Sequence, residues 1–246
     1  MFAPLSALPE LGPKDAHVWI FSTDASMDEC AEFRELLSPE EKARADRFVF
    51  DSDRVRFTAS HGLLRVQLGA YCGRRPEDLV FGVGSHGKPL LIEPAAPVQF
   101  NLSHSGSRAA LVVTANIRCG VDIEKLRAEV SDRAVAERFF CRRENEWLQS
   151  LPATQRTRGF FRLWAVKEAI LKADGKGMSI PLASVDTTNV LNGVSSSVSL
   201  PDGDGRVLSL WVGELNVADG YASALAVEGV LPGVHILQAK NLLVDP

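Results

Sequence analysis

The segment Leu163–Gly177, with the sequence LWAVKEAILKADGKG, predicts a buried helix that leads into a loop punctuated by glycine. Apolar side chains surround nearly the whole helix when it is turned at about 3.6 residues per turn; they are Phe160, Leu163, Trp164, Val166, Ile170 and Leu171. Glu168 and Lys172 lie one turn apart in the narrow polar strip that remains. Because desolvation of a charge is costly, an acid and a base on such a helix require a purpose.

The composition of the chain is that of an ordinary globular protein. Of its 246 residues, 46% are hydrophobic and 24% are charged, which fits one large domain or two small ones. The net charge of −4 argues against a nucleic-acid binder that depends on a strong overall positive field. The first residues lack a basic segment followed by an apolar core, and no run of about 18 apolar residues occurs. We therefore expect a cytoplasmic protein without a membrane span.

The cysteines predict neither a metal knuckle nor a disulfide framework. They are scattered along the chain, and no two of them have the two-residue spacing of a zinc knuckle or a redox dithiol: Cys30, Cys72, Cys119 and Cys141. We expect reduced, mostly buried thiols.

Strand and helix signals follow one another through the first half of the chain. His17–Thr23 alternates as a strand does, and Ser38 before Pro39 predicts the start of a helix that continues through Phe48. Arg54–Tyr71 has helical periodicity and is expected to end near Gly73. Five short β-like runs come next: LVFGV, PLLI, VQFNLS, RAALVVT and CGVDIE.

The second half repeats this order. Helices are expected between Asp132 and Lys172, and strands over Ser179–Val190 and Val194–Ala226, with a hairpin signal at LPDGDGR. The repetition predicts an α+β fold of two similar halves, residues 1–112 and 113–246. A cleft between the halves is the expected ligand site.

The glycine-rich stretch Gly82–Pro89, GVGSHGKP, matches parts of two phosphate-binding patterns but lacks their context. A P-loop requires Ser or Thr where this chain has Pro89, and both patterns require a following helix where this chain has LLIE. We interpret the stretch as a turn between strands, in which Lys88 is still a candidate phosphate ligand.

The stretch Phe100–Gly106, FNLSHSG, is expected to place Ser103 and His104 just past a strand end, where small polar groups face ligands. No G-x-S-x-G frame surrounds the serines, so a serine hydrolase is not indicated. On its own, His104 fits a hydrogen-bonded structural histidine as well as a ligand contact.

The run Gly120–Glu124, GVDIE, places two acids on one face of a strand. Asp122 and Glu124 project together, and Val121 and Ile123 pack on the other side. Such acids either reach solvent or share a cation, and oxygen ligands of this kind suit Mg²⁺. If Glu168 approaches them, three carboxylates converge. The alternative is a simple Glu168–Lys172 pair on an exposed helix edge.

The ordered set of FNLSHS, GVDIE and WAVKEAILKADGKG resembles the 4'-phosphopantetheinyl transferases of the larger, surfactin-synthetase-activating (Sfp) type. The last stretch is similar to that family's W-x-x-K-E-(x)3-K signature with its trailing G-K-G, and GKP and LSPEEKARADRF match further family stretches. The resemblance covers about residues 36–185. It implies a pseudo-two-fold pair of α+β halves with coenzyme A in the cleft between them.

The resemblance also implies the activity and its residues. The 4'-phosphopantetheine arm of coenzyme A is transferred to a serine of an acyl or peptidyl carrier protein, with Mg²⁺, and adenosine 3',5'-bisphosphate is released. The implied metal ligands are Asp122, Glu124 and Glu168. The implied coenzyme contacts are Arg44, Arg56, Lys88, Ser103, His104 and Lys172. A monomer is expected, because one chain supplies both halves.

Chemistry assigns roles within this set. Charge that accumulates on the pyrophosphate oxygens is stabilised by Mg²⁺, Lys172 and His104. Glu168 is the expected base for the serine proton, directly or through a metal-bound water, because burial in an apolar helix raises its pKa toward neutrality.

The first predicted helix departs from the family pattern, because Glu41 stands at one position where relatives often have a lysine. Arg44 is taken as its basic substitute. The arginines Arg138, Arg142 and Arg143 suit an acidic carrier, although a solvated helix face explains them equally well.

Two other functions fit the same residues. One is a Mg²⁺-dependent nucleotide or coenzyme A pyrophosphatase with water as its nucleophile. The other is a carrier-binding module without catalysis, in which the acids hold no metal. The first predicts coenzyme A turnover without an acceptor protein, and the second predicts no magnesium dependence.

Overall fold

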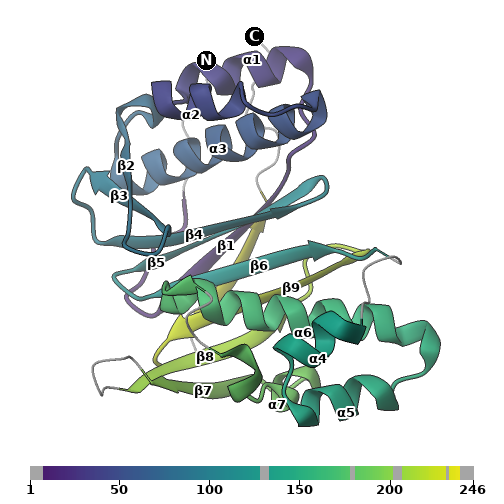
Figure 1. Cartoon of the computed structure of the whole chain (residues 1–246). Helices are drawn as coiled ribbons and strands as arrows, with labels where there is room; N and C mark the ends of the chain where they lie inside the picture. Colours follow the sequence, from purple (N-terminus) through teal and green to yellow (C-terminus); the bar gives the residue numbers. More distant parts are fainter. Residues whose placement is uncertain (1–7, 128–132, 178–180, 202–206, 231–232, 239–246) are drawn as a thin grey trace.

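The computed structural model describes residues 8–127, 133–177, 181–201, 207–230 and 233–238. These residues form two four-stranded sheets covered by helices on their outer faces, together with a small two-stranded sheet (Figure 1). The first sheet has the strand order β10-β1-β5-β4, and the second has the order β6-β9-β8-β7. The helices α1 to α3 lie over the first sheet and α6 lies over the second (Figure 1). The fold therefore has four layers.

The first half contains most of the first sheet, its helices and a small hairpin. Its elements are β1 (Asp15–Ser22), α1 (Met27–Leu36), α2 (Pro39–Ala45), α3 (Asp51–Cys72), a 3-10 turn (Pro76–Asp78), β2 (Val80–Val83), β3 (Pro89–Glu93), β4 (Val98–Ser105) and β5 (Arg108–Ala115). β2 and β3 form a separate two-stranded antiparallel sheet. Gly87, with φ of 87°, lies in their turn, and no helix follows Lys88, so the interpretation of this stretch as a turn is confirmed.

The second half repeats the order strand, helices, strands. Its elements are β6 (Cys119–Lys125), α4 (Arg133–Phe139), α5 (Arg142–Ser150), α6 (Ala153–Asp174), a 3-10 turn (Leu182–Ser184), α7 (Thr188–Leu191), β7 (Ser196–Pro201), β8 (Val207–Leu215) and β9 (Tyr221–Glu228). A last strand, β10 (Gly233–Gln238), leaves this half and pairs with β1 in parallel.

The two halves share one topology. In the first half, β5 lies between β1 and β4 and pairs antiparallel with both. In the second half, β9 lies between β6 and β8 and pairs antiparallel with both. Each sheet is covered by a helix of 22 residues, α3 or α6. This confirms the predicted α+β fold with pseudo-two-fold halves. The expected division after residue 112 falls inside β5, which runs to Ala115.

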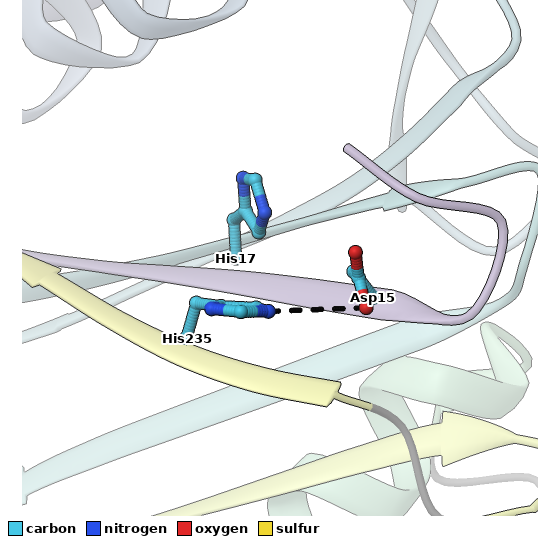
Figure 2. A group of neighbouring side chains, drawn as sticks. All are labelled: Asp15, His17 and His235. Carbon is cyan, nitrogen blue, oxygen red and sulfur yellow. Dashed lines mark ion pairs between the residues drawn. The ribbon is translucent and has the colours of Figure 1, made fainter. Parts of the chain in front are cut away.

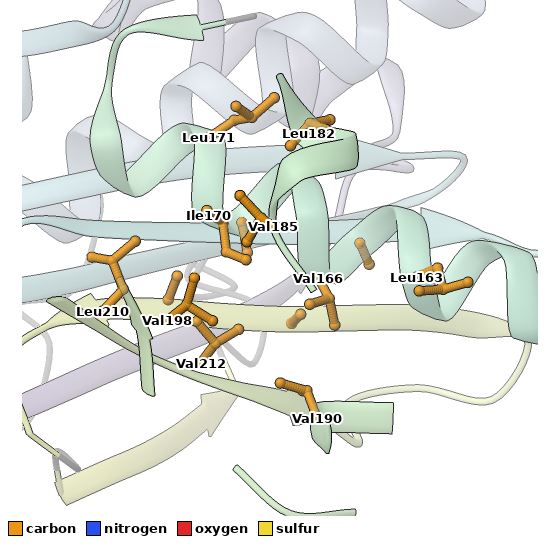
Figure 3. Packing of buried hydrophobic residues seen from close by; sticks show 14 of the residues in the cluster. Leu163, Val166, Ile170, Leu171, Leu182, Val185, Val190, Val198, Leu210 and Val212 are labelled. Atoms are coloured by element: carbon orange, nitrogen blue, oxygen red, sulfur yellow. The ribbon is translucent and has the colours of Figure 1, made fainter. Parts of the chain in front are cut away.

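Three apolar clusters hold the layers together. One joins α3 to the first sheet through Leu63, Trp19 and Leu111. A second lies between the two sheets and contains Ala16, Val18, Ile20, Ala110, Val112, Val121, Ile123, Leu225 and Val227. The third packs α6 on the second sheet, and Figure 3 shows Leu163, Val166 and Ile170 facing Val198, Leu210 and Val212. The middle cluster makes the two halves one packed body.

Local sequence signals explain most helix boundaries. The Ser38 hydroxyl accepts from the Glu41 N–H and the Glu41 carboxylate accepts from the Ser38 N–H, so a capping box starts α2 at Pro39. Gly73, with φ of 61°, ends α3 as expected. α2 ends at Ala45, so the prediction of a helix through Phe48 was wrong.

Other sequence predictions also need correction. A helix at Met27–Leu36 was missed, although Ser26 and Glu29 form a capping box before it. Leu182–Leu191 contains a 3-10 turn and a short helix instead of a strand, and residues 178–180 lie outside the described part. Of the four thiols, Cys119 is buried and the other three are half-buried.

Within the described residues, no helix combines the length and the apolar character that crossing a membrane requires.

Candidate active site

Polar side chains of β4 join the edges of the two sheets. The Val121 N–H donates to Asn101 Oδ1 at 2.9 Å, and the Lys125 N–H donates to Ser105 Oγ at 3.1 Å. Ser103 Oγ, between them, accepts from the Ile123 N–H at 3.4 Å. Every second side chain of β4 thus accepts a hydrogen bond from every second backbone N–H of β6. These N–H groups lie on the edge of the second sheet, where no neighbouring strand in the described part of the chain bonds to them. The expectation that Ser103 and His104 follow a strand end was wrong, because both lie within β4.

The same serines also donate to the two acids on β6. Ser103 Oγ donates to Asp122 Oδ1 at 2.8 Å, and Ser105 Oγ donates to Glu124 Oε2 at 2.8 Å. Asp122 is almost fully buried, whereas the Glu124 side chain keeps 20% of its exposure. Val121 and Ile123 lie in the cluster between the sheets, which confirms the predicted alternation along β6.

Gly120 shows how closely α6 approaches the acid-bearing face of β6. A Cβ atom at Gly120 would lie 2.2 Å from the Ala169 carbonyl oxygen and 2.3 Å from the Ala173 amide nitrogen. Only glycine permits this approach, which brings the helix backbone against the strand. Asp122 and Glu124, two and four residues further along, project toward the same helix.

Lys172 and Glu168 are the residues of α6 that meet these acids. Lys172 Nζ donates to Asp122 Oδ1 at 2.6 Å and to Ser103 Oγ at 2.9 Å. Burial raises the pKa of Glu168, and the neighbouring Asp122 and Glu124 raise it further, although Lys172 opposes the shift. The pKa of Glu124 is likewise raised by burial and by Asp122. The carboxylates therefore lie close enough to repel one another, as expected if the strand and helix converge.

The donor set has one feature that suits a cation. Asp122 Oδ2 is buried and has no hydrogen-bond partner, whereas Oδ1 serves both Ser103 and Lys172. A buried, unpaired carboxylate oxygen is rare unless an ion or water completes it. The three acids are nevertheless spread out. Some other trios of potential ligands within the described residues have ligand atoms that all lie within 4.8 Å of one another, but Asp122, Glu124 and Glu168 do not form such a trio.

Arg44 and His104 lie on the side of the acids toward the first half. His104 projects from the face of β4 opposite Ser103, and its pKa is lowered by burial and by the charges of Lys172 and Arg44. The Arg44 guanidinium lies 5.1 Å from the centre of the Phe57 ring. Lys172 and Arg44 therefore both lie near enough to His104 to disfavour its protonated form.

Arg56 lies at the start of α3 and is only partly paired. Its nearest carboxylates are Asp53 at 3.5 Å and Asp24 at 4.0 Å, and its Nε atom is buried without a hydrogen-bond partner. One donor of this guanidinium is therefore available to an anion.

Lys88 occupies a different environment from the one expected for a phosphate ligand. Its Nζ donates to the Cys119 carbonyl at 2.9 Å and to the Lys172 carbonyl at 2.7 Å. Burial lowers its pKa. Two of its three donors thus connect the start of β6 to the end of α6, which leaves one donor for a ligand.

Three arginines of α4 and α5 are exposed and have local partners: Arg138, Arg142 and Arg143. Arg142 donates to Glu146 at 2.7 Å, Arg143 pairs with Asp186 at 3.1 Å, and Arg138 lies over the Phe139 ring.

Sequence reasoning missed one buried ion pair next to the site. Lys167 and Glu144 are both fully buried, and Lys167 Nζ lies 2.9 Å from Glu144 Oε2. Lys167 also donates to the carbonyls of Leu182 and Val185, and Glu144 Oε1 accepts from the Thr187 N–H at 2.8 Å. A lysine on an almost wholly apolar helix was the available signal.

Comparisons with known proteins agree on one family. The family model "4'-phosphopantetheinyl transferase superfamily" matches residues 118–226, and "4'-phosphopantetheinyl transferase, N-terminal" matches residues 23–116. The 4'-phosphopantetheinyl transferase HetI of Nostoc sp. is 41% identical over 167 residues, which are 67% of this chain and 70% of that protein. The 4'-phosphopantetheinyl transferase psf-1 of Bacillus pumilus is 34% identical over 86% of this chain and 88% of that protein.

A solved structure, holo-[acyl-carrier-protein] synthase (AcpS) of Thermotoga maritima, aligns with 46% of this chain and 63% of that chain, at 20% identity and a TM-score of 0.31.

Proposed function

Because this chain belongs to the 4'-phosphopantetheinyl transferase superfamily, we propose that it transfers the 4'-phosphopantetheine group of coenzyme A to a serine of a carrier protein. The observation that most supports the location of this reaction is the contact between β6 and α6, where Lys172 Nζ donates to Asp122 Oδ1 at 2.6 Å, one helical turn from Glu168. Burial and the Asp122 charge also raise the pKa values of Glu124 and Glu168. Mutually repelling carboxylates destabilise a core, whereas phosphoryl transfer requires such groups to hold a cation beside the phosphates.

Asp122, Glu124 and Glu168 would hold Mg²⁺, as the chemistry of the donor set suggests. Mg²⁺ prefers oxygen donors and is commonly bound by a few carboxylates together with substrate phosphates. The unpaired, buried Asp122 Oδ2 supports this assignment. When bound, Mg²⁺ neutralises negative charge on the pyrophosphate oxygens.

Glu168 is the proposed proton acceptor. The carrier serine oxygen forms a new bond to the β-phosphorus, the bond from that phosphorus to the bridging oxygen breaks, and adenosine 3',5'-bisphosphate leaves. The serine proton passes to the Glu168 carboxylate. A raised pKa makes Glu168 a stronger base than an ordinary glutamate, and this shift supports the role.

Lys172 and His104 are proposed to stabilise the charge that develops on the phosphates. Lys172 uses two donors for Ser103 and Asp122 and keeps a third, and 26% of its side chain is exposed. The His104 pKa is lowered by burial and by Lys172 and Arg44, so His104 is proposed to act as a neutral hydrogen-bond donor. Fixed donors of this kind favour a transition state in which charge accumulates on oxygen.

The coenzyme phosphates are proposed to lie beside the basic residues Arg44 and Arg56 of the first half. Arg44 and Arg56 supply charge there, and the unpaired Nε of Arg56 supports a contact with an anion. Lys88 contributes its one remaining donor, and Ser103 positions Lys172 and Asp122 in addition to any contact with the coenzyme. A monomer suffices, since one chain contains both halves.

Intact mass spectrometry of an apo carrier protein tests the function. We expect the carrier to gain the mass of one phosphopantetheine after incubation with this chain, coenzyme A and Mg²⁺, to gain none with EDTA, and to regain the modification with excess Mg²⁺. Cleavage of coenzyme A without modification of any carrier would instead identify a pyrophosphatase. Carrier binding without any reaction would identify a binding module.

A further inference from the structure

A second group of potential metal ligands lies at the opposite edge of the first sheet, where β10 pairs with β1. One ligand atom each from Asp15, His17 and His235 lies within 4.8 Å of the other two, and Figure 2 shows the three side chains on one face of the two strands. Asp15 and His17 alternate along β1, and His235 is the register partner of His17 on β10. This geometry follows directly from the parallel pairing of the last strand.

His17 presents a buried nitrogen without a partner. The residue is fully buried, its Nδ1 lies 2.7 Å from the Tyr71 hydroxyl, and its Nε2 has no hydrogen-bond partner. The Tyr71 hydroxyl also accepts from Trp19 Nε1 at 2.9 Å. When Nδ1 carries the proton and donates to Tyr71, Nε2 offers its lone pair. Metal-binding histidines are usually oriented by such a second hydrogen bond.

The other two side chains, Asp15 and His235, are close to each other. The Gly12 N–H donates to Asp15 Oδ2 at 3.0 Å, which leaves Oδ1 at 3.8 Å from His235 Nε2. A Cβ atom at Gly233 would lie 2.5 Å from Asp15 Oδ1 and 3.4 Å from His235 Nε2. Glycine at this position therefore keeps both ligand atoms accessible.

The remaining group of this type is not available for a metal. Within the described residues it consists of Cys141, Glu144 and Asp186. Both Glu144 oxygens are occupied, Oε1 by Thr187 and Oε2 by the Lys167 ammonium and the Cys141 N–H. His17 Nε2, in contrast, is buried and has no hydrogen-bond partner.

We propose that Asp15, His17 and His235 bind one Zn²⁺ ion and thereby fasten β10 to β1. Two imidazoles and one carboxylate are a common three-ligand set for zinc, with water in the fourth position. Tetrahedral bonds of about 2.0–2.1 Å require ligand atoms about 3.3 Å apart, which small side-chain rotations reach from the observed spacing. His235 is 49% exposed, so the ion enters from solvent. The site is separate from the transferase carboxylates.

Zinc titration of the chelator-stripped full chain, in competition with a chromophoric chelator, tests the proposal. We expect one equivalent of ZnCl₂ to bind, and we expect the affinity to fall by at least about 100-fold in His235→Gln and in Asp15→Asn. His86→Gln, a change to a histidine in the exposed β2–β3 turn, should bind zinc as the unaltered chain does. Millimolar MgCl₂ should not displace zinc, because Mg²⁺ prefers oxygen ligands.

Hydrogen exchange provides a second readout. Zinc should slow exchange of the amides of β10 by about 10-fold or more in the unaltered chain and leave them unchanged in His235→Gln. Zinc binding weaker than about 100 μM, or equal affinity in the unaltered chain and both ligand variants, would overturn the proposal. Carrier modification by His235→Gln with Mg²⁺ should equal that of the unaltered chain, so this test is separate from that of the transferase.

Discussion

Lys167 and Glu168 are neighbours in sequence but have opposite environments on α6. Successive helix residues point about 100° apart, so Lys167 faces the core while Glu168 faces β6. Lys167 is fully satisfied by Glu144 and two carbonyls. It therefore serves the structure, and of the two neighbours only Glu168 is proposed to take part in the chemistry.

We predict that Lys167→Met destabilises the protein by about 3–5 kcal/mol, because it leaves the Glu144 carboxylate buried without a counter-ion. The free energy of unfolding in urea measures this loss. Lys42→Met is the matched control: it removes a half-buried lysine that lies 3.8 Å from the exposed Glu35, a pair expected to contribute less than about 1 kcal/mol. Equal, small losses in both variants would contradict the account.

Glu168 makes the metal-free protein less stable as the pH rises. Its pKa is raised in the folded state, so between the ordinary glutamate pKa and the raised value the folded state binds more protons than the unfolded state. The free energy of unfolding therefore falls as pH increases through this window. Below the ordinary pKa, Glu168 is protonated in both states and contributes no difference.

We predict that Glu168→Gln in EDTA is more stable than the unaltered chain at pH 7 and equally stable near pH 4, because glutamine removes the repelled charge. Urea unfolding at a series of pH values measures the difference. The control Glu32→Gln, on the exposed side of α1, should change the free energy of unfolding at pH 7 by less than about 0.5 kcal/mol. A variant that is less stable than the unaltered chain at pH 7 would contradict the stated sign.

At the scale of elements, the site depends on how closely β6 and α6 pack. Gly120 allows the helix backbone to touch the strand, and this contact determines where Glu168 and Lys172 lie relative to Asp122.

We predict that Gly120→Ala destabilises the protein by about 1–3 kcal/mol and also slows phosphopantetheine transfer, because the added methyl forces α6 away from β6. Gly84→Ala is the control, since its Cβ would make only ordinary contacts, the nearest at 3.4 Å. Thermal unfolding and the transfer rate measure the two effects. A Gly120→Ala protein as stable and active as the control would show that the close packing is unnecessary.

Part of this arrangement could be predicted from the sequence and part could not. Side chains along a strand alternate between two faces, so GVDIE predicts that Asp122 and Glu124 share one face. Side chains along a helix repeat every 3.6 residues, so the α6 segment predicts that Glu168 and Lys172 share one face. Local patterns do not reveal which strand edges meet. The sequence therefore did not predict the contacts of Asn101 and Ser105 with β6, or the hydrogen bond from Lys88 Nζ to the Cys119 carbonyl. The β10 pairing joins residues more than 200 positions apart, and it too has no local signal.

At the scale of the whole molecule, the two halves share the apolar cluster between the sheets. Val18 and Val112 from one half pack there with Val121 and Leu225 from the other. Either half alone would expose this face to water, which costs roughly 25 cal/mol per Å² of apolar surface.

We predict that fragments 1–116 and 117–246 do not fold cooperatively when separate, and that mixing them restores structure. Each fragment lacks the other side of the middle cluster, and the first also lacks β10. Near-UV circular dichroism of the separate and mixed fragments measures this. A sharp thermal transition of either fragment alone would show that the half is an independent domain.

The central claim is that the carboxylates between β6 and α6 carry out phosphopantetheine transfer. The most direct test is the single-turnover rate of carrier modification, with saturating coenzyme A and Mg²⁺, for the unaltered chain, Glu168→Gln and Glu32→Gln. We expect a loss of at least about 100-fold in Glu168→Gln, no loss in Glu32→Gln, and the same folded structure in all three. An unchanged rate in folded Glu168→Gln would contradict the central claim.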